Sequence, residues 1–152
     1  MGNGIAQVAA GAGFEVILLD INDAALEKGL AALSKSLDRL IKKESITSEQ
    51  KVQTLARIKT TTHYADLAAV SLVIEAATEN QAIKEKILAQ VDQVVSKETI
   101  IASNTSSISI THLASLNSQP ERFIGIHFFN PPPLMALLEV IMGKETSPET
   151  LK

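Results

Sequence analysis

Residues 103–139, SNTSSISITHLASLNSQPERFIGIHFFNPPPLMALLE, decide the fold of this chain and hold its chemistry. The stretch starts at the end of an apolar run and continues as a polar cluster of serine and threonine. A second apolar run ends in His127, and a third contains a single acid, Glu139. In doubly wound α/β sheets the carboxyl ends of the strands face the ligand crevice. We therefore expect the ligand site in this stretch.

Glu139 is the most informative residue of the stretch. In LLEVIM, residues 137–142, all residues except Glu139 are apolar, on both faces of the predicted strand. A carboxylate buried there without a partner is strongly destabilising, so Glu139 needs one. His127 is the best candidate, because it ends the neighbouring predicted strand. A carboxylate that orients an imidazole is a general-base arrangement, and a structural ion pair near a strand end is the alternative.

Composition excludes several classes of function. The 152 residues suffice for one domain with a sizeable core, and the net charge of −3 gives no reason to expect nucleic-acid binding. The chain lacks cysteine, and its three histidines lack ligand spacing, so we expect no metal site. No apolar run is long enough to span a membrane, and no signal pattern begins the chain. Cytoplasm is the default location.

The N-terminal sequence MGNGIAQVAAGAGFEVILLD, residues 1–20, predicts a helix, a glycine turn and a strand that closes on an acid. In dinucleotide-binding units, a helix N-terminus receives the pyrophosphate, and an acid about 20 residues later binds the ribose. Gly2 and Asp20 suit these two roles. A carboxylate at the ribose would repel a 2′-phosphate, which favours NAD over NADP.

A helical hairpin is predicted next. Asn22 is expected to cap a long helix that runs to about Glu44 and carries a stripe of leucines. Thr47 and Gln50 form the pattern of a capping box, which predicts a second helix through Ala56.

Further strands are expected over residues 58–61, 72–76 and 100–103, with a short helix over 65–70. A helix should follow Asn80 and run to Ser96. Glu75 ends an apolar strand, but no chemical role is assigned to it. The predicted buried stripe of the helix comprises Ile83, Ile87, Val91 and Val94.

SNTSSISIT, IGIHFFNPPPLM and LLEVI together resemble the NAD-binding domain of the 3-hydroxyacyl-CoA dehydrogenases, the short-chain 3-hydroxybutyryl-CoA type in particular. The resemblance runs from residue 1 to residue 152. It implies an α/β fold, with a Rossmann-type, mainly parallel sheet and a helical hairpin inserted after the second strand. It also implies reversible, NAD-dependent oxidation of the 3-hydroxyl of (S)-3-hydroxyacyl-CoA to 3-oxoacyl-CoA, in fatty-acid or butanoate metabolism.

The resemblance also assigns roles near the reacting atoms. His127 would take the hydroxyl proton, and Glu139 would orient His127 and stabilise its cationic form. Ser106 and Asn130 would position the substrate and the nicotinamide, and Ser106 would contact both.

Four other residues match binding positions of the family. Glu79 and Lys84 would lie near the nicotinamide end of NAD. For Glu79 the alternative is an acid that complements a helix dipole, and for Lys84 it is a solvated lysine. Ser36 and Lys43, on the first helix of the hairpin, would contact coenzyme A.

The family pattern is a strand followed by G-x-G-x-M-G-x-G-I-A, and this chain begins at its M-G-x-G-I-A part. We expect residues 1–152 to be an NAD-binding domain that lacks its first strand, without the helical domain through which the parent enzyme dimerises. The alternative function is a catalytically inactive nucleotide-binding fragment. Another Rossmann enzyme, such as a 3-hydroxyacid dehydrogenase, is disfavoured by the HFFNP segment and by the pair of Ser36 and Lys43.

Overall fold

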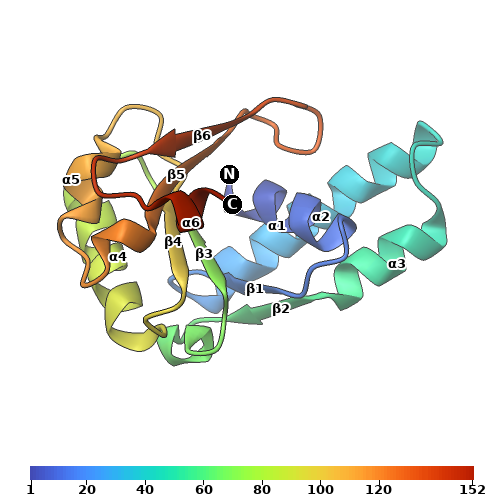
Figure 1. Ribbon diagram of the computed structural model, residues 1–152. Helices are drawn as coiled ribbons and strands as arrows, with labels where there is room; N and C mark the ends of the chain where they lie inside the picture. Colours follow the sequence, from blue (N-terminus) through green and yellow to red (C-terminus); the bar gives the residue numbers. More distant parts are fainter. The chain divides into compact units, whose positions relative to one another are not determined.

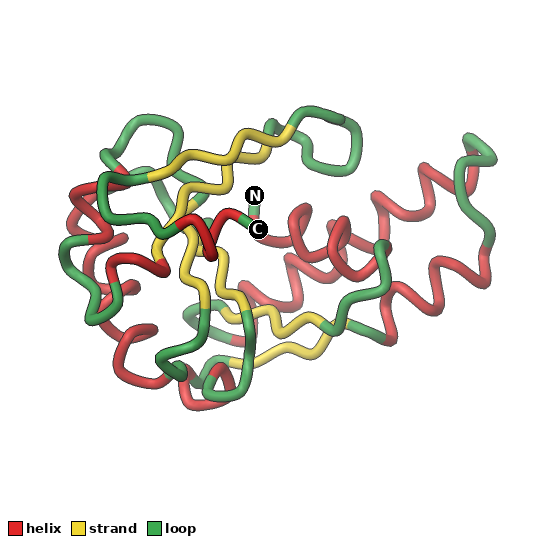
Figure 2. The backbone as a smooth tube through the Cα atoms, viewed as in Figure 1, coloured by secondary structure: helices red, strands yellow, loops and turns green.

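The computed structural model describes residues 1–152, which form two compact units. Unit 1 comprises Met1–His63 and Pro131–Leu134, and unit 2 comprises Tyr64–Asn130 and Met135–Lys152. Each unit has its own sheet, one of two strands and one of four (Figures 1 and 2). Both units combine helices with parallel strand pairs, which confirms the predicted α/β class.

The helical and strand segments follow one another along the chain. The helical segments are α1 (Gly2–Gly11), α2 (Asp23–Lys42), α3 (Ser48–Ala56), η1 (Tyr64–Leu67), α4 (Gln81–Val94), α5 (Ile110–Ala114), η2 (Pro120–Arg122) and α6 (Pro148–Leu151). The strands are β1 (Val16–Leu19), β2 (Ile58–Thr61), β3 (Leu72–Glu75), β4 (Ile100–Ser103), β5 (Phe123–Phe128) and β6 (Leu138–Met142). No helix is both long and apolar enough to cross a membrane.

Unit 1 contains the predicted helical hairpin, α2 and α3. The Asn22 side chain accepts a hydrogen bond of 2.8 Å from the backbone N–H of Ala25, so it caps α2 as expected. The capping box at α3 is also present: Thr47 Oγ1 accepts from the N–H of Gln50, and Gln50 Oε1 accepts from the N–H of Thr47. Strands β1 and β2 pair in parallel. The buried core joins α1 to α2 through Ala6, Leu33 and Leu37.

Unit 2 is built on the sheet order β3-β4-β5-β6. The first three strands are parallel, and β6 runs antiparallel to β5 at the edge (Figure 1). Helix α5 packs so tightly on β5 that a Cβ on Gly125 would lie 2.9 Å from Ile110 Cδ1. The buried side chains of this core include Leu88, Leu113 and Phe123.

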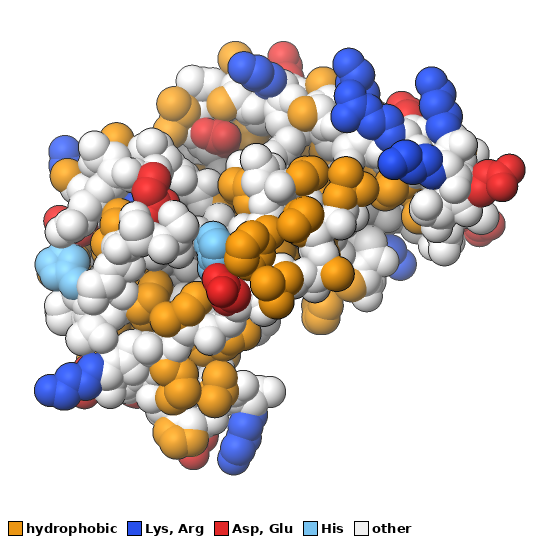
Figure 3. Space-filling view, turned by 90° about the horizontal axis from the view of Figure 1, so that it is seen from above, with side chains coloured by type: hydrophobic (Ala, Val, Ile, Leu, Met, Phe, Trp, Pro, Cys, Tyr) orange, Lys and Arg blue, Asp and Glu red, His pale blue; other side chains and the backbone are white.

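The prediction that Glu139 is enclosed by apolar side chains is wrong. All five residues of β6 are exposed, because β6 is an edge strand and nothing covers its apolar side chains. Val140 and Met142 are half exposed, and exposed hydrophobic side chains are visible on the face shown in Figure 3. The carboxylate of Glu139 is therefore partly solvated in this chain.

The predicted buried stripe of α4 is confirmed at Val91, which is buried, and wrong at Ile83, whereas Ile87 and Val94 are half-buried. Ile83 is exposed, and the buried side chains of α4 are Lys84, Leu88 and Val91. Apolar periodicity places the buried face by counting apolar residues, so it cannot find a face that includes a charged lysine. The predicted helix over residues 65–70 is a shorter 3₁₀ turn, Tyr64–Leu67.

Candidate functional site

His127 and Glu139 form the pair that the sequence predicts. They lie directly opposite each other on β5 and β6, and His127 Nδ1 is 2.8 Å from Glu139 Oε2. The side chain of His127 is 19% exposed and that of Glu139 is 50% exposed. The imidazole also contacts the ring of Phe129, with 4.8 Å between ring centroids. Cross-strand pairing in an antiparallel ladder thus fixes the orientation of the imidazole.

The contact with Glu139 decides which ring nitrogen of His127 can do chemistry. A carboxylate accepts hydrogen bonds, so Nδ1 carries the proton in this contact. In the neutral ring Nε2 is then a free base, and no side chain or backbone group bonds to it in the structure. His127 is therefore arranged to take a proton from a ligand at Nε2.

A cavity of about 230 Å³ lies in front of this pair. Ser106, His127 and Glu139 all line it, together with Thr105, Ser107, Ile108, Ser109, Ile110 and Ile141. Asn130, which follows β5, is exposed and does not line the cavity. The structure thus brings together three of the four predicted catalytic residues.

The polar loop after β4 is tied to the strand that carries His127. Buried Asn104 accepts a hydrogen bond of 2.7 Å from the backbone N–H of Phe128, the residue after His127. The backbone N–H of Asn104 donates to the carbonyl of Glu75 at 2.8 Å. Asn104 is not among the predicted site residues, although it directly follows an apolar strand, which was the available signal.

Glu79 lies close to the same loop. Its Oε1 accepts hydrogen bonds from the hydroxyls of Thr105 and Ser107, and its Oε2 lies 3.8 Å from Lys84 Nζ. Asn80 is the N-cap of α4, so Glu79 lies outside the first helical turn, and its main contacts are these side chains. Partial burial raises the pKa of the Glu79 carboxyl, but the hydrogen bond from Thr105, the charge of Lys84 and the bonds from Ser107 outweigh it and hold that pKa below its ordinary value.

This lowered pKa predicts a pH-dependent stability. A carboxyl whose pKa is lower in the folded state stabilises that state above its unfolded pKa, and the stabilisation is lost as pH falls through the folded pKa. We expect Glu79→Gln to be less stable than the parent at neutral pH, and the difference to shrink below a pH of about 4.5, the ordinary pKa. Urea unfolding across this pH range measures the difference in the free energy of unfolding. Glu27→Gln, at an exposed position, is the control. Parallel pH profiles for Glu79→Gln and the parent would contradict the account.

Lys84 is not a solvated lysine. Its side chain is 1% exposed, and its Nζ lies 3.0 and 2.9 Å from the two carboxylate oxygens of Glu75. Like Asn104, Glu75 and Thr105 are not among the predicted site residues. A lone acid at the end of the apolar strand LVIE was the signal for Glu75.

In unit 1, the two residues predicted for the diphosphate and ribose of the cofactor fit those groups. Gly2 is the first residue of α1, whose first turn contains no acid and whose N-cap side chain makes no hydrogen bond. Free N–H groups at a helix N-terminus favour a phosphate. Asp20 directly follows β1, and its exposed carboxylate accepts a hydrogen bond from the N–H of Ile21 at 2.8 Å.

Ser36 and Lys43 lie toward the C-terminal end of α2. Ser36 is half-buried within the helix, and Lys43 is its exposed C-cap residue. Seven residues make about two helical turns, so the two positions lie on the same side. Their predicted role toward coenzyme A stays a prediction.

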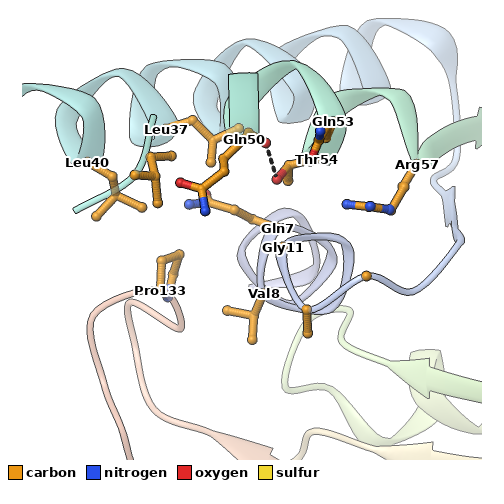
Figure 4. Close-up of a pocket in the computed structure, with 13 residues that line it drawn as sticks. Gln7, Val8, Gly11, Leu37, Leu40, Gln50, Gln53, Thr54, Arg57 and Pro133 are labelled. Carbon is orange, nitrogen blue, oxygen red and sulfur yellow. Dashed lines mark hydrogen bonds between the residues drawn. The ribbon is translucent and has the colours of Figure 1, made fainter. Parts of the chain in front are cut away.

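A larger cavity, of about 450 Å³, lies in unit 1 among α1, α2 and α3 (Figure 4). Val8, Leu37 and Leu40 contribute apolar surface to it, whereas Gln7 and Arg57 are polar. Arg57 Nη1 donates to the carbonyl of Ala10 at 3.3 Å. None of the predicted catalytic or binding residues lines this cavity, and it contains no acid or histidine. Its larger size therefore does not make it the centre of the chemistry.

Comparison with known proteins identifies relatives over the whole chain. The family model for the NAD-binding domain of 3-hydroxyacyl-CoA dehydrogenase matches residues 1–152. A 3-hydroxybutyryl-CoA dehydrogenase from Bradyrhizobium diazoefficiens is 48% identical over 152 residues, which are 100% of this chain and 52% of the relative. A fatty acid oxidation complex subunit alpha from a Psychrobacter species is 42% identical over 99% of this chain and 21% of the relative.

The fold is similar to solved structures as well. The (S)-3-hydroxybutyryl-CoA dehydrogenase from Ralstonia eutropha superposes with a TM-score of 0.97 at 59% identity, over 99% of this chain and 53% of that one. The chain spans about half the length of the curated 3-hydroxybutyryl-CoA dehydrogenases from Bradyrhizobium diazoefficiens and Deinococcus radiodurans.

Proposed function

Because the chain belongs to the 3-hydroxyacyl-CoA dehydrogenase family through its NAD-binding domain, we propose that the protein carrying it interconverts (S)-3-hydroxyacyl-CoA and 3-oxoacyl-CoA. NAD is the cofactor of this family. We further propose a short-chain substrate, in keeping with relatives that are 3-hydroxybutyryl-CoA dehydrogenases. The observation that carries the proposal is the pair of His127 and Glu139, 2.8 Å apart at a cavity that Ser106 also lines.

In this proposal His127 is the general base. Its Nε2 takes the proton of the 3-hydroxyl, and in the reverse direction the imidazolium returns it to the carbonyl oxygen. NAD, when bound, supplies the hydride acceptor at its nicotinamide. Glu139 holds Nδ1–H and stabilises the imidazolium that forms. The hydroxyl of Ser106 and the amide of Asn130 orient the substrate oxygen and the nicotinamide.

The remaining predicted residues bind the cofactor and the coenzyme A part of the substrate. Gly2 offers backbone N–H groups to the pyrophosphate, and Asp20 accepts from the ribose hydroxyls. Ser36 and Lys43 would hold coenzyme A. We assign Glu79 and Lys84 to the surroundings of the nicotinamide.

We propose the following organisation for the longer protein. Residues 1–152 form its NAD-binding domain, a strand before Met1 is the first strand of that domain, and a helical domain after Lys152 forms a homodimer. The length of the matched relatives supports a longer protein, because the chain covers about half of them. We assign the protein to the cytoplasm.

A second candidate function is a nucleotide-binding module without turnover. The exposed edge strand β6 and the half-exposed Glu139 favour it for the 152 residues alone. NADH binding by the 152-residue chain, without oxidation of NADH by acetoacetyl-CoA, would support this candidate.

Glu139→Gln tests the proposed role of the pair. Glutamine keeps the shape of the side chain and removes the charge that stabilises the imidazolium. We expect kcat to fall by about tenfold or more, a part of the roughly 10²–10⁴-fold that a general base contributes, while NADH affinity stays unchanged. Steady-state kinetics and NADH fluorescence titration measure the two quantities. Exposed Glu145→Gln is the matched control, and an equal loss of kcat and NADH affinity in Glu139→Gln would refute the role.

A further inference from the structure

We propose that Glu75 is a positioning residue, which acts with Lys84 and Ser103 to hold Glu79 and the loop of Ser106 in their working geometry. The inference rests on the proposed function, because it concerns the same nicotinamide and substrate site. All of these residues belong to unit 2.

The carboxylate of Glu75 has no capacity left for a ligand. Its Oε1 accepts from the N–H of Ala77 at 2.7 Å and from Lys84 Nζ at 3.0 Å. Its Oε2 accepts from Lys84 Nζ at 2.9 Å and from Ser103 Oγ at 2.7 Å. A carboxylate offers about four lone-pair sites, and these four bonds occupy them. Glu75 therefore neither binds substrate nor moves a proton, and what it does is join β3, β4 and α4.

The contacts of Glu75 continue into a closed ring of side chains. Ser103 Oγ accepts from the backbone N–H of Thr105 at 3.3 Å, and the hydroxyl of Thr105 donates to Glu79. Glu79 lies 3.8 Å from Lys84, and Lys84 returns to Glu75. Each member of the ring thus contacts two others, so that moving one displaces its neighbours.

The ring holds the loop that presents Ser106 through Thr105 and Glu79. Thr105 and Ser107, on either side of Ser106, both donate their hydroxyls to Glu79. Thr105 Oγ1 also accepts from the backbone N–H of Ile108 at 3.0 Å. The loop is therefore held by side-chain bonds before and after Ser106, and the hydroxyl of Ser106 is left exposed to the cavity.

Stability alone gives no reason for this arrangement. A buried ion pair is often no more stabilising than apolar side chains of the same volume, because desolvation offsets the attraction between the charges. The side chains of Glu75 and Lys84 are each 1% exposed, so the desolvation cost is large. A role in fixing geometry explains why charged groups, with directional bonds, occupy these positions.

Ser103→Ala tests the proposal without unpairing a buried charge. It removes the bonds to Glu75 and to the N–H of Thr105, and it leaves Lys84 beside Glu75. In the full-length protein that carries this chain, we expect kcat with acetoacetyl-CoA to fall about 10-fold or more, since a misplacement near 1 Å can cost roughly 10²-fold. The KM for acetoacetyl-CoA should change little.

Thr99→Ala is the matched control. Thr99 is also buried, at the other end of β4, and its hydroxyl donates to the carbonyl of Val70 at 2.8 Å. We expect a similar loss of thermal stability in both variants and a loss of kcat in Ser103→Ala alone. If both variants keep the parental kcat, or lose it equally, Glu75 is only structural and the proposal is overturned.

Amide hydrogen exchange tests, independently of turnover, whether these side chains hold the loop of Ser106 in place. We expect Ser103→Ala to speed exchange at the N–H groups of Thr105 and Ile108, whereas Thr99→Ala leaves them as in the parent. Unchanged exchange would overturn the positioning role. If the parent protein does not oxidise NADH with acetoacetyl-CoA, the proposed function fails, and the exchange result still tests the ring.

Discussion

Replacing His127 with glutamine is expected to lower kcat about 10²–10⁴-fold, the typical contribution of a positioned general acid or base. Glutamine retains a hydrogen-bonding side chain toward Glu139, but its amide cannot take a proton at neutral pH. NADH affinity should stay near the parental value, because no predicted cofactor contact is removed. Stopped-flow NADH oxidation with acetoacetyl-CoA measures the first quantity, and fluorescence titration with NADH measures the second.

The chain offers a matched control for this variant. His112 Nε2 lies 2.8 Å from Glu85 Oε1, the same separation as between His127 and Glu139. His112→Gln therefore also removes a histidine that contacts a glutamate, but away from Ser106 and the cavity. We expect it to keep the parental kcat. Equal kcat values for His112→Gln and His127→Gln would show that His127 is not the base.

Lys84→Met is expected to lower the free energy of unfolding by more than any of the other single substitutions. Methionine keeps an apolar stem of similar length and removes the charge that faces Glu75. Breaking a buried ion pair by removing one partner typically costs about 3–5 kcal/mol, because the other charge is left buried. We expect the free energy of unfolding, measured by urea denaturation, to fall by about this amount.

Lys86, two residues further along α4, provides the comparison. Its side chain is exposed and makes no ion pair in the structure, so Lys86→Met should change the free energy of unfolding by no more than about 0.5 kcal/mol. The double variant Glu75→Leu with Lys84→Met should regain much of the stability that Lys84→Met loses, since it leaves no unpaired charge. A loss in Lys84→Met no greater than in Lys86→Met would contradict the description of this pair as buried and mutually dependent.

Local signals predicted the elements of the fold well. The capping box of Thr47 and Gln50 fixed the start of α3, and the expected end at Ala56 agrees with the structure. Such a signal lies within four residues, so no tertiary contact is needed to read it. The pairing of His127 with Glu139 was also predicted, because strand alternation and the search for a partner both pointed to it.

Burial and contacts that depend on the packing of different elements could not be predicted from the sequence. Glu139 was predicted to lie among buried apolar side chains, whereas the strand order makes β6 an exposed edge. Lys84 was predicted to lie near the nicotinamide, with a solvated lysine as the alternative. Its burial against Glu75 was not predicted, because Glu75 lies on another element and apolar periodicity treats lysine as exposed. Thr105 lacked any signal of its own, since its contact with Glu79 depends on how the loop after β4 folds back.

The central claim is that the protein carrying this chain acts on a 3-oxoacyl group held by coenzyme A. The most direct measurement is NADH oxidation by the full-length protein with acetoacetyl-CoA, compared with free acetoacetate at the same concentration. We expect rapid oxidation with acetoacetyl-CoA and little with acetoacetate, since free acetoacetate lacks the coenzyme A that Ser36 and Lys43 are proposed to hold. No oxidation with acetoacetyl-CoA, or equal rates with both substrates, would contradict it.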